Sequence, residues 1–128
     1  MDYYTSHTLT VRGEALQNAD SAHRILGELN EWLAARDVIG YALCRGDLLT
    51  YGGKFSTEII FECSDLAKWY EHDEDMAACS LAFPELTFCL HGEGEDDFDY
   101  WDCYYHDGKS EECRVQWSMP EPTHIKWE

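Results

Sequence analysis

The chain has 128 residues, a length that fits one domain built around a single hydrophobic core. It contains 26 acidic and 9 basic residues, and its net charge of −17 disfavours direct binding to nucleic-acid phosphates or anionic membranes. Apolar residues make up 45 % of the chain, which excludes a disordered protein. We therefore expect one acidic domain over residues 1–128 that attracts basic surfaces.

The cysteines and the start of the chain indicate a cytoplasmic protein. The first residues lack the basic and apolar segments of a secretion signal, and no apolar run is long enough to span a bilayer. The six cysteines are widely spaced and include no Cys-x-x-Cys pair. We therefore expect free thiols, with neither a structural zinc site nor any other cofactor.

The first half of the chain predicts a strand, a helix and a hairpin. Apolar and polar residues alternate over Thr8–Arg12, which is the period of a half-buried strand. Over Asp20–Arg36, apolar residues recur at the spacing of an amphipathic helix. Val38–Cys44 and Thr57–Glu62 are rich in β-forming residues and are predicted to pair as strands. The sequence leaves open whether Leu48–Tyr51 extends a strand or lies in the loop.

A second helix is predicted between Ser64 and Pro84. Ser64 is a favourable N-cap residue, and the proline ends the helical pattern. His72 and Asp73 mark a position where this helix could kink or divide into two shorter helices.

Three strands are predicted after this helix. The first is Leu86–His91, where apolar residues alternate with polar ones, and an acidic loop over Glu93–Asp97 follows it. Phe98–Tyr105 and Cys113–Trp117 are predicted to form a hairpin around Asp107–Gly108, a dipeptide favoured in tight turns. The tail from residue 119 contains two prolines and is predicted to be irregular.

This order of elements predicts an α+β fold of the ferredoxin-like class, with an added C-terminal hairpin. In that fold the sheet is antiparallel and both helices lie on one face. The other face is then available either for a partner or for the added hairpin.

The aromatic residues near the C-terminal end of the chain are interleaved with carboxylates. If this segment is a strand, Tyr100 and Tyr104 lie on one face and Trp101 and Tyr105 on the other. Aromatic anchors among negative charges suit a basic, arginine-rich partner, whereas a second interpretation buries all the rings between sheet and helix. The predicted partner-binding residues are Glu93, Glu95, Asp96, Asp97, Asp99, Tyr100, Trp101, Asp102, Tyr104 and Tyr105.

The segment His72–Asp75 offers an alternative site for metal-dependent chemistry, using His72, Asp73 and Asp75. Consecutive helical residues point in different directions, however, and carboxylates at a helix start complement the helix dipole. The sequence contains no nucleophile elbow, phosphate-binding loop, dinucleotide fingerprint or His-Glu-x-x-His motif. We therefore expect a binding protein and keep a small metal-dependent enzyme as an alternative.

Between Lys68 and Lys109, the segments KWYEHDEDM, LAFPELTF before LHGEGED, and Trp-x-x-Tyr-x-x-Asp-Gly-Lys form a pattern of their own. This pattern resembles small proteins encoded by phages, plasmids and integrated elements, of the YubB-type ferredoxin-like domain group. The resemblance covers about a third of the chain. It implies a ferredoxin-like fold and a mobile-element origin, and it brings no catalytic residues with it.

The charge and the resemblance together lead to a functional hypothesis. A small acidic protein of a mobile element could inhibit host defence, as an anti-CRISPR protein does, by mimicking the charge of DNA on a basic nucleic-acid-binding surface. Its partner would be a CRISPR effector or another nucleic-acid-binding protein in the host cytoplasm. The alternative is a structural module whose uncovered sheet face pairs with a second copy as a homodimer.

Overall fold

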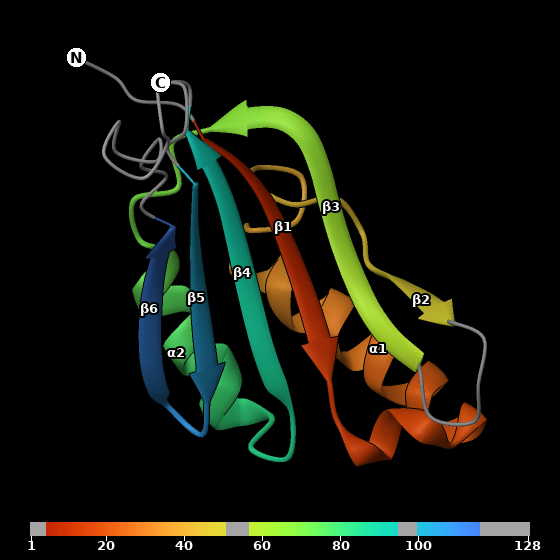
Figure 1. Cartoon of the computed structure of the whole chain (residues 1–128). Coiled ribbons are helices and arrows are strands. Elements are labelled where there is room, and N and C mark those ends of the chain that lie inside the picture. Colours follow the sequence, from red (N-terminus) through yellow and green to blue (C-terminus); the bar gives the residue numbers. More distant parts are fainter. Residues whose placement is uncertain (1–4, 51–56, 95–99, 116–128) are drawn as a thin grey trace, which may run out of the picture.

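The computed structural model describes residues 5–50, 57–94 and 100–115. In this part of the chain, one sheet lies in front of two α-helices, which cover a single face of it (Figure 1). The elements are β1 (Thr5–Arg12), η1, a short 3₁₀ helix (Glu14–Gln17), α1 (Ala19–Ala35), β2 (Asp47–Thr50), β3 (Thr57–Ala67), α2 (His72–Ala82), β4 (Thr87–Gly94), β5 (Tyr100–His106) and β6 (Lys109–Val115).

The sheet has six strands in the order β2-β3-β1-β4-β5-β6, and every neighbouring pair is antiparallel. The first four strands and the two α-helices have the ferredoxin-like arrangement. The hairpin of β5 and β6 extends the sheet beyond β4 and does not cover its second face. The predicted α+β, ferredoxin-like fold with an added hairpin is therefore confirmed.

The core lies between the sheet and the helices. Alternate residues of the central strands and one stripe of each helix are inaccessible to solvent, as the strand and helix periods require. Burying a side chain of this size contributes about 1.5–3 kcal/mol. The fully buried members include Leu9, Val11, Leu29, Leu33, Ile59, Phe61, Met76, Phe88 and Leu90.

The helix predicted over Asp20–Arg36 is confirmed as α1, and its start has a clear cause. The side chain of Asn18 accepts a hydrogen bond of 3.1 Å from the backbone N–H of Ser21, which caps the helix.

No helix in the described part of the chain is long and apolar enough to cross a membrane.

The predicted strand over Val38–Cys44 is wrong. The segment folds into a compact turn in which the carbonyl oxygen of Val38 accepts hydrogen bonds from the backbone of three later residues. Gly40, with φ of 92°, turns the chain back on itself. The apolar character of this segment reflects burial of the turn against the core. The strand that precedes β3 in the chain and pairs with it is β2.

The predicted start of the second helix at Ser64 is also wrong. Strand β3 continues to Ala67, which pairs with Thr5 of β1, so the segment after Ser64 takes part in the sheet. Pairing with β1 outweighs the local preference of Ser64 for a helix N-cap. The helix α2 begins at His72, near the break considered from the sequence, and ends before Pro84 as predicted.

The C-terminal hairpin has the predicted turn. Asp107 and Gly108 have φ values of 48° and 79°, the positive values that a two-residue turn between antiparallel strands favours. Strand β6 begins directly after the turn, at Lys109, four residues before the predicted Cys113. Glu93, which was predicted in a loop, belongs to β4. The rest of that loop, residues 95–97, and the tail lie outside the described residues.

Candidate functional site

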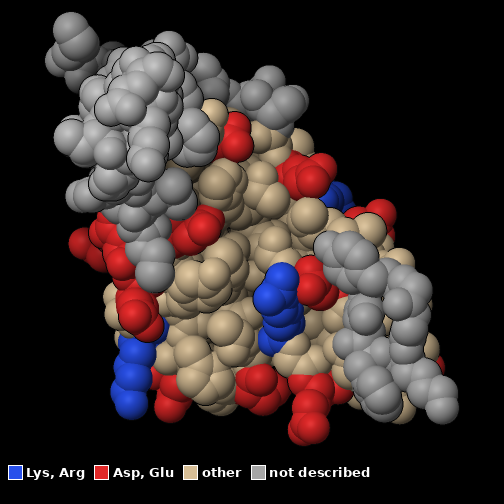
Figure 2. Space-filling model, in the orientation of Figure 1, with Lys and Arg blue, Asp and Glu red and all other residues tan. Residues whose placement is uncertain are grey.

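The sheet face opposite the helices is uncovered in the described part of the chain. Figure 2 shows this face: uncharged side chains occupy much of its middle, and Asp and Glu side chains gather along its margins. The middle includes the partly exposed Thr8, Thr10 and Cys89 of the central strands β1 and β4. At the end of β1, Arg12 forms an ion pair of 2.8 Å with Glu58 of β3.

Strand β5 divides its aromatic residues between the two faces, as the alternation predicted. Tyr100 and Tyr104 are 37 % and 43 % exposed on the uncovered face, whereas Trp101 and Tyr105 are 7 % and 0 % exposed beneath α2. The interpretation that buries all the rings is therefore wrong. Trp101 and Tyr105 were predicted to contact a partner, but they belong to the core and are not accessible from this face.

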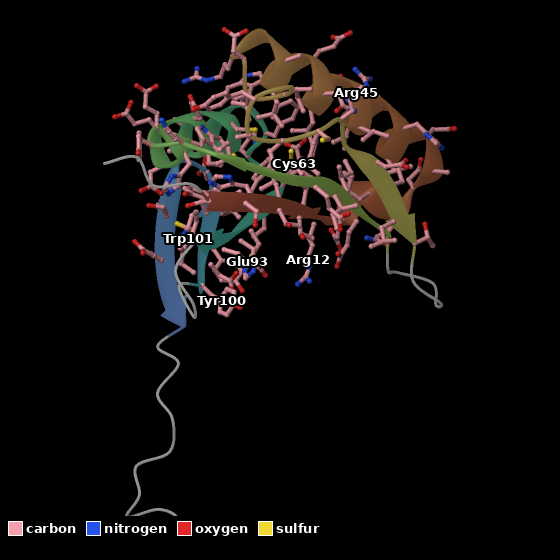
Figure 3. The ribbon with its side chains drawn as sticks, turned by 90° about the horizontal axis from the view of Figure 1, so that it is seen from above. Arg12, Arg45, Cys63, Glu93, Tyr100 and Trp101 are labelled. Atoms are coloured by element: carbon pink, nitrogen blue, oxygen red, sulfur yellow. The ribbon has the colours of Figure 1, made fainter. Side chains whose placement is uncertain are left out.

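The strand register places a carboxylate beside each exposed tyrosine. Glu93 of β4 lies directly opposite Tyr100, and Glu111 of β6 lies directly opposite Tyr104. Asp102 lies between the two tyrosines on the same face of β5, because side chains two residues apart share a face. In Figure 3, Glu93, Tyr100 and Arg12 point away from the helices.

His91 links two of these carboxylates. Its Nδ1 lies 2.6 Å from an oxygen of Asp102, its Nε2 lies 3.2 Å from an oxygen of Glu93, and its ring is stacked near Tyr100 with 6.3 Å between centroids. Partial burial lowers the pKa of His91, but the hydrogen bonds and charges of Asp102 and Glu93 outweigh it, so the pKa is raised. The imidazolium form fits this position, since both ring nitrogens then donate.

The structure therefore brings together four of the predicted residues, Glu93, Tyr100, Asp102 and Tyr104. Glu95, Asp96, Asp97 and Asp99 lie outside the described residues. Two members of the face, His91 and Glu111, were not predicted from the sequence. Both had a signal: His91 alternates with the buried Leu90, and counting outward from the Asp107–Gly108 turn pairs Tyr104 with Glu111.

The alternative site at the start of α2 does not converge on a common point. Asp73 accepts a hydrogen bond from the Tyr105 hydroxyl, and Asp75 binds the Trp69 indole N–H and the guanidinium of Arg36. Each carboxylate therefore has a partner that ties α2 to the rest of the fold. In residues 5–50, 57–94 and 100–115, no group of three or more His, Cys, Asp or Glu side chains is placed to hold a metal ion.

His72 is partly exposed and lies against a group of buried rings between α2 and the sheet. Its Nδ1 donates to the carbonyl oxygen of Trp69 over 2.8 Å, and its ring stacks on Trp101 with 4.7 Å between centroids. His7 of β1 is 2 % exposed and lies against Trp69 and Trp101. Burial and then the charge of His72 lower the pKa of His7 to about 4.

Cys63, Cys79 and Cys103 are free thiols, as the sequence predicted for the cysteines in general. Burial, which outweighs the nearby charge of Arg36, raises the pKa of Cys79 to about 12, so its thiol stays protonated at neutral pH. This cysteine is a core residue and not a nucleophile.

The feature of the described residues that best fits recognition of a partner is the pairing of exposed tyrosines with carboxylates on the uncovered sheet face.

Comparisons of the chain with protein-family models, with curated proteins and with solved structures found no match.

Proposed function

We propose that the protein binds and blocks a basic, nucleic-acid-binding surface of another protein, as an anti-CRISPR-type inhibitor of host defence does. The observation that supports this best is the uncovered sheet face, on which the exposed Tyr100 and Tyr104 alternate with Asp102 and lie opposite Glu93 and Glu111. The mobile-element origin expected from the pattern between Lys68 and Lys109 is part of this proposal, and the link to host defence depends on it.

The charge of this face favours a basic partner. By strand register, its only described lysine or arginine residues are Arg12 and Lys109, and Arg12 is already paired with Glu58. Negative charge speeds the approach of a basic surface and repels nucleic acid and a second copy of the same face. The carboxylates at uncovered positions of the described strands are Asp47, Glu58, Glu62, Glu93, Asp102 and Glu111.

The tyrosines supply the contact area that charge alone lacks. Tyrosine is enriched among residues that dominate binding energy at interfaces, because its rigid ring buries a large area at low entropic cost. On this face, each exposed ring is bordered by carboxylates that can remain near solvent at the rim. The arrangement matches a contact whose centre is desolvated and whose edge is charged.

Affinity purification followed by a competition assay tests this proposal. The tagged protein is used to capture partners from a host lysate at low salt, and the captured protein is then purified and titrated with labelled DNA or RNA. We expect a nucleic-acid-binding protein that is released at high salt, and whose nucleic-acid binding is inhibited by this chain. Capture of a protein whose nucleic-acid binding is unaffected would contradict the proposal.

A pair of variants with equal net charge separates the sheet face from charge in general. The first replaces Glu93, Asp102 and Glu111 by their amides, and the control replaces three exposed carboxylates in the helices. The control residues are Glu14, Glu31 and Glu74. We expect the first variant to lose inhibition and the control to keep it, whereas equal loss in both would show that the face has no special role.

A further inference from the structure

The two exposed tyrosines of β5 repeat a single arrangement. Each lies directly opposite a glutamate on a neighbouring strand, Tyr100 opposite Glu93 and Tyr104 opposite Glu111. Directly paired residues in an antiparallel sheet have Cβ atoms about 4.5–5.5 Å apart and share a face. Each ring therefore has a carboxylate at its side, and both pairs face away from the helices.

The distance between the two pairs follows from the strand. Tyr100 and Tyr104 are four residues apart, and a strand rises about 3.3–3.4 Å per residue, so the pairs are separated by about 13 Å. Asp102 lies midway between them on the same face. A strand lying along β5 would bring its own residues i and i+4 to the same spacing.

An aromatic ring beside a carboxylate is suited to a guanidinium group. The planar cation stacks on the ring face through cation–π attraction, while its N–H groups donate to the carboxylate in a fork. Lysine satisfies this arrangement less well, because its ammonium is a compact, strongly hydrated charge without a planar face.

We infer that Tyr100 with Glu93 and Tyr104 with Glu111 form two arginine-binding subsites, which together bind two arginines at positions i and i+4 of an extended basic segment. This inference rests on the proposed function, because it names the chemical group of the partner that the sheet face recognises. It goes further because it requires tighter binding of arginine than of lysine, and tighter binding at the i, i+4 spacing than at others.

The two subsites differ in what already occupies their carboxylates. Glu93 is 3.2 Å from the Nε2 of His91, which also stacks near Tyr100, so protonated His91 competes with an incoming cation there. No hydrogen bond or ion pair joins Glu111 to another described residue. Lys109 lies two residues before Glu111 on the same face of β6 and lines one pocket with Glu111 and Tyr104. A cation of the chain itself therefore lies near each subsite, but only the carboxylate of Glu93 is hydrogen-bonded to it.

Short serine–threonine peptides test the inference directly. One peptide carries arginines at i and i+4, a second carries lysines at the same positions, and a third carries arginines at i and i+2. Binding is followed by NMR shifts of the β5 and β6 amides at constant ionic strength. We expect the first peptide to bind about tenfold more tightly than the lysine peptide, since two stacked cations each add a modest gain.

Variants of the subsite of Tyr104 and Glu111 give a second test. Tyr104→Leu removes the ring but keeps apolar bulk, Tyr104→Phe keeps the ring, and Glu111→Gln removes the charge. We expect Tyr104→Leu and Glu111→Gln to weaken binding of the arginine peptide severalfold. We expect Tyr104→Phe to bind this peptide as tightly as the wild type does. Tyr70→Leu, at a 66 % exposed ring between β3 and α2, is the matched control and should bind as the wild type does.

The outcomes separate this inference from the proposed function. Equal affinity for arginine and lysine peptides, equal affinity for both arginine spacings, or no effect of Tyr104→Leu would overturn the inference. In each of these cases, salt-sensitive capture and inhibition of a nucleic-acid-binding protein would leave the proposed function intact. Arginine-selective binding together with a captured protein whose nucleic-acid binding is unaffected would instead overturn the proposed function alone.

Discussion

The Nδ1 of His91 lies 2.6 Å from a carboxylate oxygen of Asp102, across the pairing of β4 with β5. The other ring nitrogen faces Glu93, so the imidazole bridges two acidic side chains of the uncovered sheet face. A histidine in this position makes the charge of the face depend on pH.

His91 is expected to stabilise the fold more at low pH than at high pH. Its pKa in the folded protein is raised by Asp102 and Glu93 against the effect of partial burial. The contribution is therefore fully present below the unfolded value of about 6.5 and is lost as pH rises through the raised pKa. Urea denaturation of wild type and His91→Gln should show a stability difference that shrinks with rising pH. A difference that grows with pH would contradict this, and His23→Gln on α1 serves as the exposed control.

His7 is expected to make the fold sensitive to acid. Its folded pKa is lowered from 6.5 to about 4 by burial and by the charge of His72, and the rings of Trp69 and Trp101 enclose it. Protonation of the unfolded chain therefore removes stability as pH falls from 6.5 through 4, by about 3 kcal/mol in full.

The variant His7→Phe tests this expectation, because a phenyl ring fills the same space and takes no proton. We expect its free energy of unfolding to fall less than that of the wild type between neutral pH and pH 4, as measured by urea denaturation at several pH values. Parallel losses in the two proteins would show that other groups cause the sensitivity to acid.

The hydroxyl of Tyr105 is expected to anchor α2 to β5. Tyr105 is fully buried, and its hydroxyl donates to Asp73 at the start of the helix. Tyr105→Phe should reduce the free energy of unfolding by about 1 kcal/mol, since Asp73 is partly solvated and can turn to water. Thermal and urea unfolding measure the change. A loss of partner binding at unchanged stability would instead give Asp73 a direct functional role.

Gly92 is expected to be required by the close approach of Trp101. A Cβ atom at position 92 would lie 2.2 Å from the indole of Trp101, which packs under α2 and cannot move without disturbing His72. Gly92→Ala should therefore destabilise the protein by about 1–3 kcal/mol. Gly27→Ala on α1 is the control, because its Cβ meets nothing within 4 Å and should stabilise the helix by about 0.5–1 kcal/mol. Equal effects of the two variants would contradict the steric explanation.

Local patterns predicted much of the fold because they depend on near neighbours in the chain. The helical period identified α1, and the Asp107–Gly108 turn identified the C-terminal hairpin. Alternation along β5 assigned Tyr100 and Tyr104 to one face and the buried rings to the other. Each of these signals is complete within one element, so no distant contact was needed to interpret it.

The errors arose where a distant contact outweighed a local preference. Val38–Cys44 has strand-forming residues, but it folds as a buried turn because the core takes its apolar side chains. Ser64 is a good helix cap, yet its segment continues β3, which pairs with β1, so the helix begins only at His72.

The amino-acid sequence by itself determined the charge of −17, the class of the fold and the faces of its strands. Only the tertiary structure decided that His91 bridges Asp102 and Glu93, that His7 is buried among indole rings, and that Glu111 lies beside Tyr104. The physical reason is that composition and periodicity act within one element, whereas these relationships depend on the register between strands and on how the helices close over one face of the sheet.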